Sequence, residues 1–234
     1  MLKSNRQLPF PNLLNARDLG GCLTRDGQDT RWHSLLCADD LHQLTRDGVQ
    51  AVLAYGVRTV IDLRFPAEVD RHPNIFQHHA NGVDYVHMSL LGQSEDMWRA
   101  RRPDAPKEFW NGVALECAQV EIGAILRVIA QASSGGVLFH CLAGKDRTGV
   151  LAALLLALAD VEPAAIVDDY AMSAENLREA RLAAFPDIER AVVLERLRCP
   201  PERVHHMLAH LDRHYDGSSG YLATIGLSSR PKNG

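Results

Sequence analysis

Residues 137–158 read VLFHCLAGKDRTGVLAALLLAL, and this stretch decides the fold class. The run Val137-Leu138-Phe139-His140 is short and continuously apolar, which predicts a buried strand. Residues 148–158 are apolar on nearly every side, which predicts a buried helix. Only the loop 141–147 lies between them. The chain therefore passes from a buried strand through a tight loop straight into a buried helix.

The flanking segments continue this alternation of strands and helices. Gly56 is placed to end a helix that begins near Thr45, and the β-branched residues 57–62 predict a strand directly after it. Residues 83–88 predict another strand, and the apolar spacing over 107–131 predicts one long amphipathic helix. This pattern, without a long linker, is typical of an α/β fold with a central, mainly parallel sheet flanked by helices. We expect a single domain over residues 1–234.

The C-terminal third is predicted to be helical. Pro163 suits the first turn of a helix, and Pro186 and Pro200-Pro201 divide the chain up to His214 into several short helices. The tail 216–234 is rich in Gly and Ser, so we expect it to be partly flexible.

Composition excludes several classes of protein. The net charge of -4 and the pI near 6.2 give no general basic field for nucleic acid or an anionic membrane, so a bound anion needs a local site. No signal-peptide core or membrane-length apolar run is visible. Five widely spread cysteines without a C-x-x-C pair argue against a disulfide framework and a zinc site. We expect a cytoplasmic protein without metal or cofactor, although export without a cleaved signal stays open.

The loop 141–147 has the properties of an anion site. A loop that enters a helix N-terminus directs free backbone N–H groups and the positive end of the helix dipole toward its centre. Arg147 adds a planar fork that matches two phosphate oxygens. Cys141 lies at the other end of the same loop, where those N–H groups stabilise a thiolate. These features predict a nucleophile facing a bound phosphate group.

Neighbouring residues are predicted to support this loop. Gly144 permits the positive φ and the close backbone approach of a tight cradle. The Thr148 hydroxyl can lie near the sulfur of Cys141, and we expect His140 to bond nearby backbone and not to act as a base.

The sequence from His140 to Gly149, HCLAGKDRTG, resembles the H-C-x-x-G-x-x-R-[ST]-G signature of protein tyrosine phosphatases. Its AGKDRTG ending is similar to bacterial and fungal tyrosine/serine and phosphoinositide phosphatases of the PtpB type. NARDLGG at 15–21, TVIDLR at 59–64 with Glu68, and Gly220-Tyr221-Leu222 also resemble that family. The resemblance covers nearly the whole chain and implies a protein tyrosine phosphatase-like fold with additional C-terminal helices.

The resemblance implies roles for the loop and for residues outside it. The phosphate-binding residues would be Leu142, Ala143, Gly144, Lys145, Asp146, Arg147 and Thr148. Arg17 and Asp18 would either buttress the loop or contact substrate. Asp62, at a strand end, would either cap a helix or pair with Lys145.

The sequence leaves alternatives for the substrate and for the class of function. A cysteine-dependent phosphatase acting on phosphotyrosine, and on phosphoserine or phosphothreonine, ranks first. A phosphoinositide phosphatase ranks second, because Lys145 resembles the lysine of lipid-directed members and could bind a second phosphate. A weak phosphate-binding module would keep the cradle. Such modules often lose the cysteine or the arginine, and this chain has both, which counts against this class. A sulfur-transferring or arsenate-reducing protein has no evident need for the GKDRTG ending.

The general acid has two candidates, because no W-P-D tripeptide occurs in the chain. The K-D-R order, distinctive of this branch of the family, favours Asp146. Asp96 follows the strand 83–88, where a movable acid loop falls in dual-specificity phosphatases.

The region 174–214 is a candidate helical lid by resemblance to relatives that have one. Its arginines at 178, 181, 190, 196 and 203 are expected to be exposed. The alternative is that these helices only pack on the core.

Overall fold

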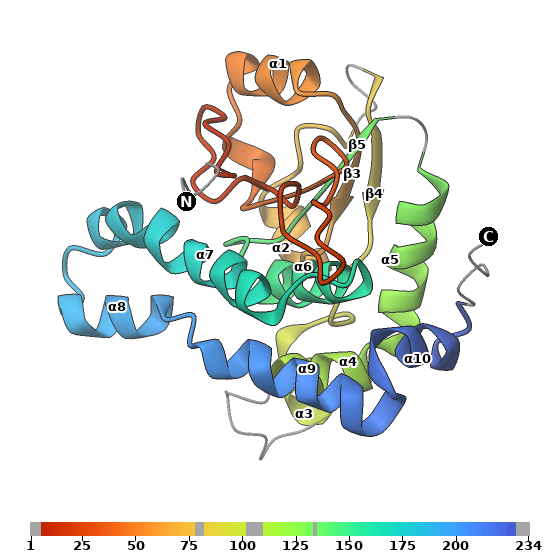
Figure 1. Ribbon diagram of the computed structural model, residues 1–234. Coiled ribbons are helices and arrows are strands. Elements are labelled where there is room, and N and C mark those ends of the chain that lie inside the picture. The colour runs from red at the N-terminus through yellow and green to blue at the C-terminus, as the bar shows by residue number, and fades with distance from the viewer. Residues whose placement is uncertain (1–5, 78–81, 102–109, 133–134, 228–234) are drawn as a thin grey trace.

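The computed structural model describes residues 6–77, 82–101, 110–132 and 135–227, and its centre is a five-stranded sheet (Figure 1). The strand order is β1-β2-β5-β3-β4. The strands are β1 (Arg17–Asp18), β2 (Leu35–Ala38), β3 (Val57–Asp62), β4 (Asp84–His87) and β5 (Gly136–His140). Strand β1 is antiparallel to β2, and all other neighbours are parallel. The predicted α/β class with a mainly parallel sheet is confirmed.

Helices surround this sheet. They are η1 (Leu41–Gln43), α1 (Arg46–Ala54), α2 (Pro66–Arg71), α3 (Glu95–Arg101), α4 (Trp110–Cys117), α5 (Gln119–Gln131), α6 (Asp146–Leu158), α7 (Pro163–Ala184), α8 (Arg190–Leu197), α9 (Pro201–Tyr215) and α10 (Gly217–Thr224). As expected, the helix before β3 begins after Thr45, whose Oγ1 accepts from the Gly48 N–H at 3.3 Å, and Gly56 follows it with φ +103°.

The central strand β5 is buried on both faces, because successive side chains of a strand alternate. Val137 and Phe139 pack in one apolar cluster with residues of α4, α5, α6 and α9. Leu138 packs in a second cluster with residues of α1 and of the N-terminal segment. This double burial explains why the strand reads as a continuous apolar run.

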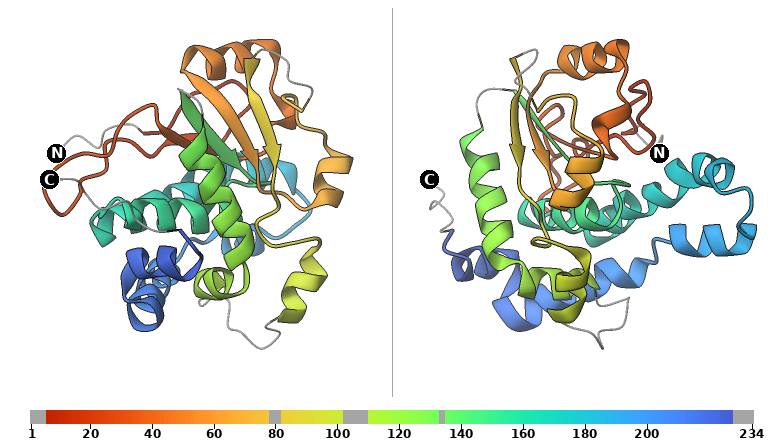
Figure 2. Two further views of the ribbon diagram at one scale, coloured as in Figure 1. Left: turned by 90° about the vertical axis from the view of Figure 1, so that its right-hand side faces the viewer. Right: turned by 180° about the vertical axis from the view of Figure 1, so that it is seen from behind.

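The single long helix predicted over 107–131 is wrong. Helices α4 and α5 are separate and meet at Ala118; residues 107–109 lie outside the described residues. Helix α4 packs against α9, while α5 covers one face of the sheet (Figure 2). Val120, which supported the apolar spacing, is 82% exposed. Because α4 and α5 pack against different partners, tertiary packing overrides the sequence periodicity and separates the two helices at Ala118.

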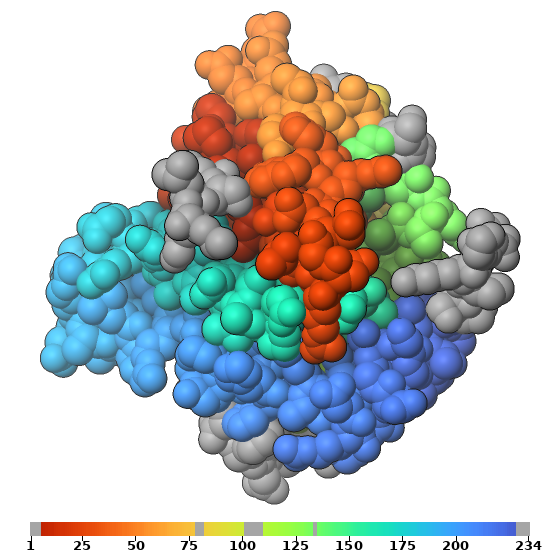
Figure 3. Space-filling model, in the orientation of Figure 1, coloured from red at the N-terminus to blue at the C-terminus, as the bar shows by residue number. Residues whose placement is uncertain are grey.

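The C-terminal helices are longer than predicted. Helix α7 is one helix of 22 residues, Pro186 follows its end, and Pro201 is the first residue of α9. Helix α8 turns back along α7, and their connection projects from the body of the molecule (Figures 1 and 3). We call the segment 174–197 the arm. Helix α9 packs in the main core through Val204, Met207 and Leu211, so it is not part of the arm.

The segment after α9 is ordered by a buried tyrosine. Helix α10 occupies much of the tail that was expected to be partly flexible, and the Tyr221 hydroxyl donates to the Leu115 carbonyl at 2.8 Å. Residues 228–234 of that tail lie outside the described residues. Within the described residues, no helix combines the length and apolar character that crossing a membrane requires.

Candidate active site

The loop 141–145 lies at the carboxyl edge of the sheet. Ala38, His140 and Asp62 are the last residues of three neighbouring parallel strands and share one level of the register. Ligand sites of open α/β sheets lie outside this edge. The loop leaves β5 there and enters α6.

The loop carbonyls are bound on its outer side. The Leu142 carbonyl accepts from the Asp40 N–H at 3.3 Å, and the carbonyls of Ala143 and Gly144 accept from Asn15 Nδ2 at 3.0 and 2.9 Å. A trans peptide directs its N–H opposite to its C=O. Loop N–H groups therefore face inward, together with the first N–H groups of α6, which lack intrahelical acceptors. This geometry makes an anion cradle.

Only glycine fits in the middle of the cradle. Gly144 has φ +64°, and a Cβ there would lie 2.6 Å from the Ala38 carbonyl oxygen. The loop thus packs directly on the end of β2. The positive φ at Gly144 confirms the conformation predicted from the sequence of the loop.

Cys141 begins the loop at the end of β5 and is 2% exposed. The Thr148 Oγ1, one turn into α6, is buried and has no hydrogen-bond partner among the described residues. An unpartnered buried hydroxyl is available to donate to a thiolate or to a bound anion.

Arg147 is held as a flat fork by Glu68. Its Nη1 and Nη2 both donate to the Glu68 carboxylate, the latter at 2.9 Å, and its guanidinium lies 4.8 Å from the centre of the Phe65 ring. Glu68 also accepts from the Phe65 N–H at 2.7 Å, which fixes it at the start of α2. The guanidinium is thereby oriented before any ligand binds.

The charges of this pair are mutually stabilised. Burial alone would lower the pKa of Arg147, but the hydrogen bond to Glu68 and the negative charges nearby raise it. Burial alone would raise the pKa of Glu68, but Arg147 lowers it. Both groups are therefore ionised at neutral pH.

Asp62 neither caps a helix nor pairs with Lys145, so both predicted roles are wrong. Arg64 binds it through Nε and Nη2, at 2.9 and 2.6 Å, and the Tyr85 hydroxyl donates to it at 3.0 Å. Its Oδ2 lies 3.5 Å from His140 Nε2. Burial opposes ionisation of Asp62, but His140 and Arg64 hold its pKa well below the usual range. Arg64, Tyr85 and His140, not the loop lysine, satisfy this carboxylate.

His140 links this buried ion pair to the loop. Its Nε2 lies 2.8 Å from Asn74 Nδ2, and its Nδ1 lies 3.2 Å from the Cys141 carbonyl oxygen. The ring is fully buried between these groups. The contact to backbone is the one that sequence analysis expected.

Lys145 and Asp146 both point to the C-terminal helices. Lys145 Nζ donates to the carbonyls of Arg196 and Arg198, at 2.7 and 3.4 Å. Asp146 Oδ1 accepts from Arg203 at 2.9 Å, although the Asp146 side chain is 43% exposed. Arg203 is therefore half-buried and engaged, not the exposed arginine that was expected.

Asp96 lies in the exposed first turn of α3. Among the described residues, no hydrogen bond or ion pair joins Asp96 to the loop 141–147.

The two residues of β1 have different surroundings. Arg17 is fully buried; it donates to Asn15 Oδ1 at 2.5 Å and its Nε lies 3.5 Å from Asp169. It thus reaches the loop through Asn15. Asp18 accepts from the N–H groups of Gly20 and His33 and orders the turn after β1, without a hydrogen bond to the loop.

The geometry around Cys141 agrees with the comparison with known families. Residues 8–232 match the model of the tyrosine phosphatase family. The chain belongs to this family. It is 32% identical over 203 residues to a tyrosine-protein phosphatase of Nostoc commune, covering 82% of this chain and 69% of the relative.

Two further matches to this tyrosine phosphatase have lower sequence identity. A Cupriavidus necator protein, provisionally named a tyrosine-protein phosphatase, is 27% identical over 77% of this chain and 67% of its own length. The crystal structure of TpbA from P. aeruginosa is 14% identical, with a TM-score of 0.39 over 72% of this chain and 89% of that one.

Sequence reasoning assigned no role to three residues that hold the phosphatase loop: Asn15, Glu68 and Arg203. Asn15 opens the NARDLGG element, and Glu68 follows Phe65-Pro66 at the third position of α2, where a glutamate commonly bonds back to the helix start. These patterns mark the positions but not their partners. Arg203 has no such signal.

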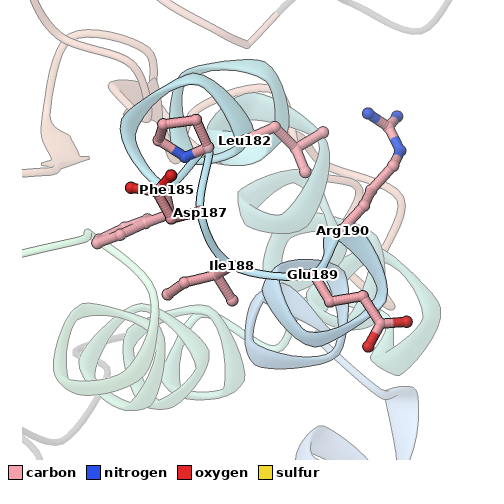
Figure 4. A pocket seen from close by; sticks show the side chains of 7 residues that line it. Leu182, Phe185, Asp187, Ile188, Glu189 and Arg190 are labelled. Carbon is pink, nitrogen blue, oxygen red and sulfur yellow. The ribbon is translucent and has the colours of Figure 1, made fainter.

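Two further observations bear on other sites in this phosphatase. Among the described residues, no group of three or more His, Cys, Asp or Glu side chains is arranged to hold a metal ion. A hollow of about 390 Å³ lies at the tip of the arm (Figure 4). Its lining comprises Leu182, Phe185, Pro186, Asp187, Ile188, Glu189 and Arg190, so it is separate from the loop 141–147.

Proposed function

We propose that this phosphatase hydrolyses phosphotyrosine with Cys141 as its nucleophile, as in the PtpB-type branch that the HCLAGKDRTG loop resembles. One observation carries the proposal. Arg147 is clamped by Glu68 beside a loop whose carbonyls are bound on the outside, which is the arrangement that a phosphate dianion requires.

The reaction has two displacements at phosphorus. The Cys141 thiolate attacks phosphorus, the bond to the phenolic oxygen breaks, and the leaving oxygen takes a proton from a carboxylic acid. A thiophosphate intermediate remains, held by Arg147 and the loop N–H groups. Water then attacks phosphorus, the S–P bond breaks, and the carboxylate accepts the proton from water. Thr148 donates to the departing sulfur.

Contacts of Lys145 support phosphotyrosine over phosphoinositide. A lysine ammonium has three donors. Nζ already donates to the carbonyls of Arg196 and Arg198 and lies 3.9 Å from Asp146 Oδ1, which leaves little of it for a second phosphate. The arm also packs near the loop, because Leu177, Val193 and Leu197 form an apolar cluster against which Ala143 packs. We therefore also propose that the arm gates access of substrate to the loop. The proposed lid is residues 174–197 and not 174–214, because α9 packs in the main core.

A substrate panel tests this order. We expect kcat/KM to be largest for a phosphotyrosine peptide, lower for phosphoserine and phosphothreonine peptides, and lowest for soluble phosphoinositides, measured side by side by phosphate release. A strong preference for the phosphoinositide would overturn the order and would assign Lys145 to a second phosphate.

The general acid is proposed to be Asp146. Its replacement by Asn keeps an oxygen that accepts from Arg203 but removes the transferable proton. We expect Asp146→Asn to lower kcat by about 10²- to 10⁴-fold for substrates with poor leaving groups. Activated aryl phosphates should lose far less, and the alkaline limb of the pH–rate profile should flatten.

The matched variant is Asp96→Asn, which makes the same change in the exposed turn of α3. It is expected to retain the parent profile. The same leaving-group dependence in Asp96→Asn, with a normal Asp146→Asn enzyme, would transfer the role to Asp96.

A further inference from the structure

Every hydrogen-bonding position of the Asn15 side chain is used, and the two donors bind the loop. Nδ2 donates to the carbonyls of Ala143 and Gly144, at 3.0 and 2.9 Å. Oδ1 accepts from Arg17 Nη1 at 2.5 Å and from Asn176 Nδ2 at 3.1 Å. The residue is fully buried. An amide has two donor and two acceptor positions, so this side chain is saturated.

These partners allow only one orientation of the amide. Arg17 has only donors, so it requires Oδ1, and the two carbonyls require Nδ2; Asn176 then donates to the same Oδ1. The backbone is fixed as well, because the Asp39 carboxylate accepts from the Asn15 N–H at 2.9 Å. Arg17 is itself anchored near Asp169 on α7. The amide is therefore held from its backbone, from β1 and from α7.

The two carbonyls that Asn15 binds belong to the peptides that carry the N–H groups of Gly144 and Lys145. Holding each carbonyl outward holds the corresponding N–H inward, because C=O and N–H are opposed in a trans peptide. Rotation of either peptide would replace a donor with an acceptor facing the anion. Glycine at 144 makes such rotation less costly than any other residue would.

We propose that Asn15 is a positioning residue for catalysis, which keeps two donors of the anion cradle directed at the transferring phosphoryl group. The proposal rests on the proposed function of the loop. It predicts that losing the amide affects the reaction itself and not only the stability of the fold.

The test compares Asn15→Ala with Asn12→Gly. Asn12 lies in the same segment and donates to the Gln43 carbonyl at 3.1 Å, and glycine tolerates its φ of +62°. The control therefore loses a similar bond away from the loop. We expect Asn15→Ala to lower kcat by about 10- to 100-fold and to weaken inhibition by orthovanadate. Both are measured at a temperature well below the melting temperature of the variant. Asn12→Gly should keep both parent values.

Asn15→Asp is the second variant, of the same size, and covers the case in which Asn15→Ala does not fold. It keeps Oδ1 for Arg17 but turns an oxygen toward the two carbonyls. We expect low activity that recovers relative to the parent as the pH falls, because a protonated carboxyl donates one hydrogen bond. Parent kcat and vanadate inhibition in a folded Asn15 variant, with only a lower melting temperature, would overturn the proposal. An inactive parent would instead refute the proposed function.

Discussion

Replacing Cys141 with serine is expected to abolish phosphatase turnover, by on the order of 10⁴-fold or more in kcat. A serine hydroxyl is far less acidic than a thiol, so the cradle that stabilises a thiolate does not supply an alkoxide. The cradle itself is unchanged, since its donors are backbone N–H groups and Arg147. Steady-state kinetics on an aryl phosphate, with binding of inorganic phosphate measured by calorimetry, should show lost turnover and retained binding.

Cys117→Ser is the matched control, because Cys117 lies on α4 and is half-buried. It should retain parent turnover. Retained turnover in Cys141→Ser would show that Cys141 is not the nucleophile.

Replacing Arg147 with lysine is expected to lower kcat by about 10²- to 10³-fold, although the charge is kept. An ammonium cannot bridge the Glu68 carboxylate and two phosphate oxygens in one plane, and it loses the contact of the guanidinium with the Phe65 ring. Phosphate affinity should fall with kcat, measured by kinetics and calorimetry. Arg99→Lys, which changes an exposed ion pair with Glu95 on α3, is the matched control. Equal kcat and phosphate affinity in the parent and Arg147→Lys would contradict this role.

The Arg147–Glu68 pair should also make the stability of the folded enzyme fall at acidic pH. Because the pKa of Glu68 is lowered in the fold, its ionised form stabilises the native state above the ordinary carboxyl pKa. That contribution is lost as the pH falls through the lowered value. The pair therefore persists through the neutral range.

The strand, loop and helix around Cys141 could be predicted because their signals are local. The apolar run 137–140, the Gly144 turn and the apolar helix after it are adjacent in the chain, and each constrains the next. The bend at Ala118 could not be predicted in this way, since it depends on where α9 and the sheet lie. Periodicity within 107–131 carries no information about those partners.

The supporting contacts of the loop were predicted poorly for the same reason. Asn15 meets Ala143 across 128 residues, and Arg147 meets Glu68 across 79. Sequence motifs include Asn15 and Glu68, but they do not indicate which residues these side chains contact. Lys145 and Asp62 show the converse error: two opposite charges were considered as a pair, although each has nearer groups in the fold.

We expect Cys141 to carry the phosphoryl group between the two displacements. Quenched-flow mixing with an excess of a phosphotyrosine peptide, followed by mass analysis of the digested protein, tests it directly. We expect one transient phosphoryl group on the digest fragment that contains Cys141, which forms as fast as the dephosphorylated substrate peptide is released. Release of the dephosphorylated peptide in step with phosphate throughout, without modification of Cys141, or a phosphoryl group on another residue, would overturn this role of Cys141.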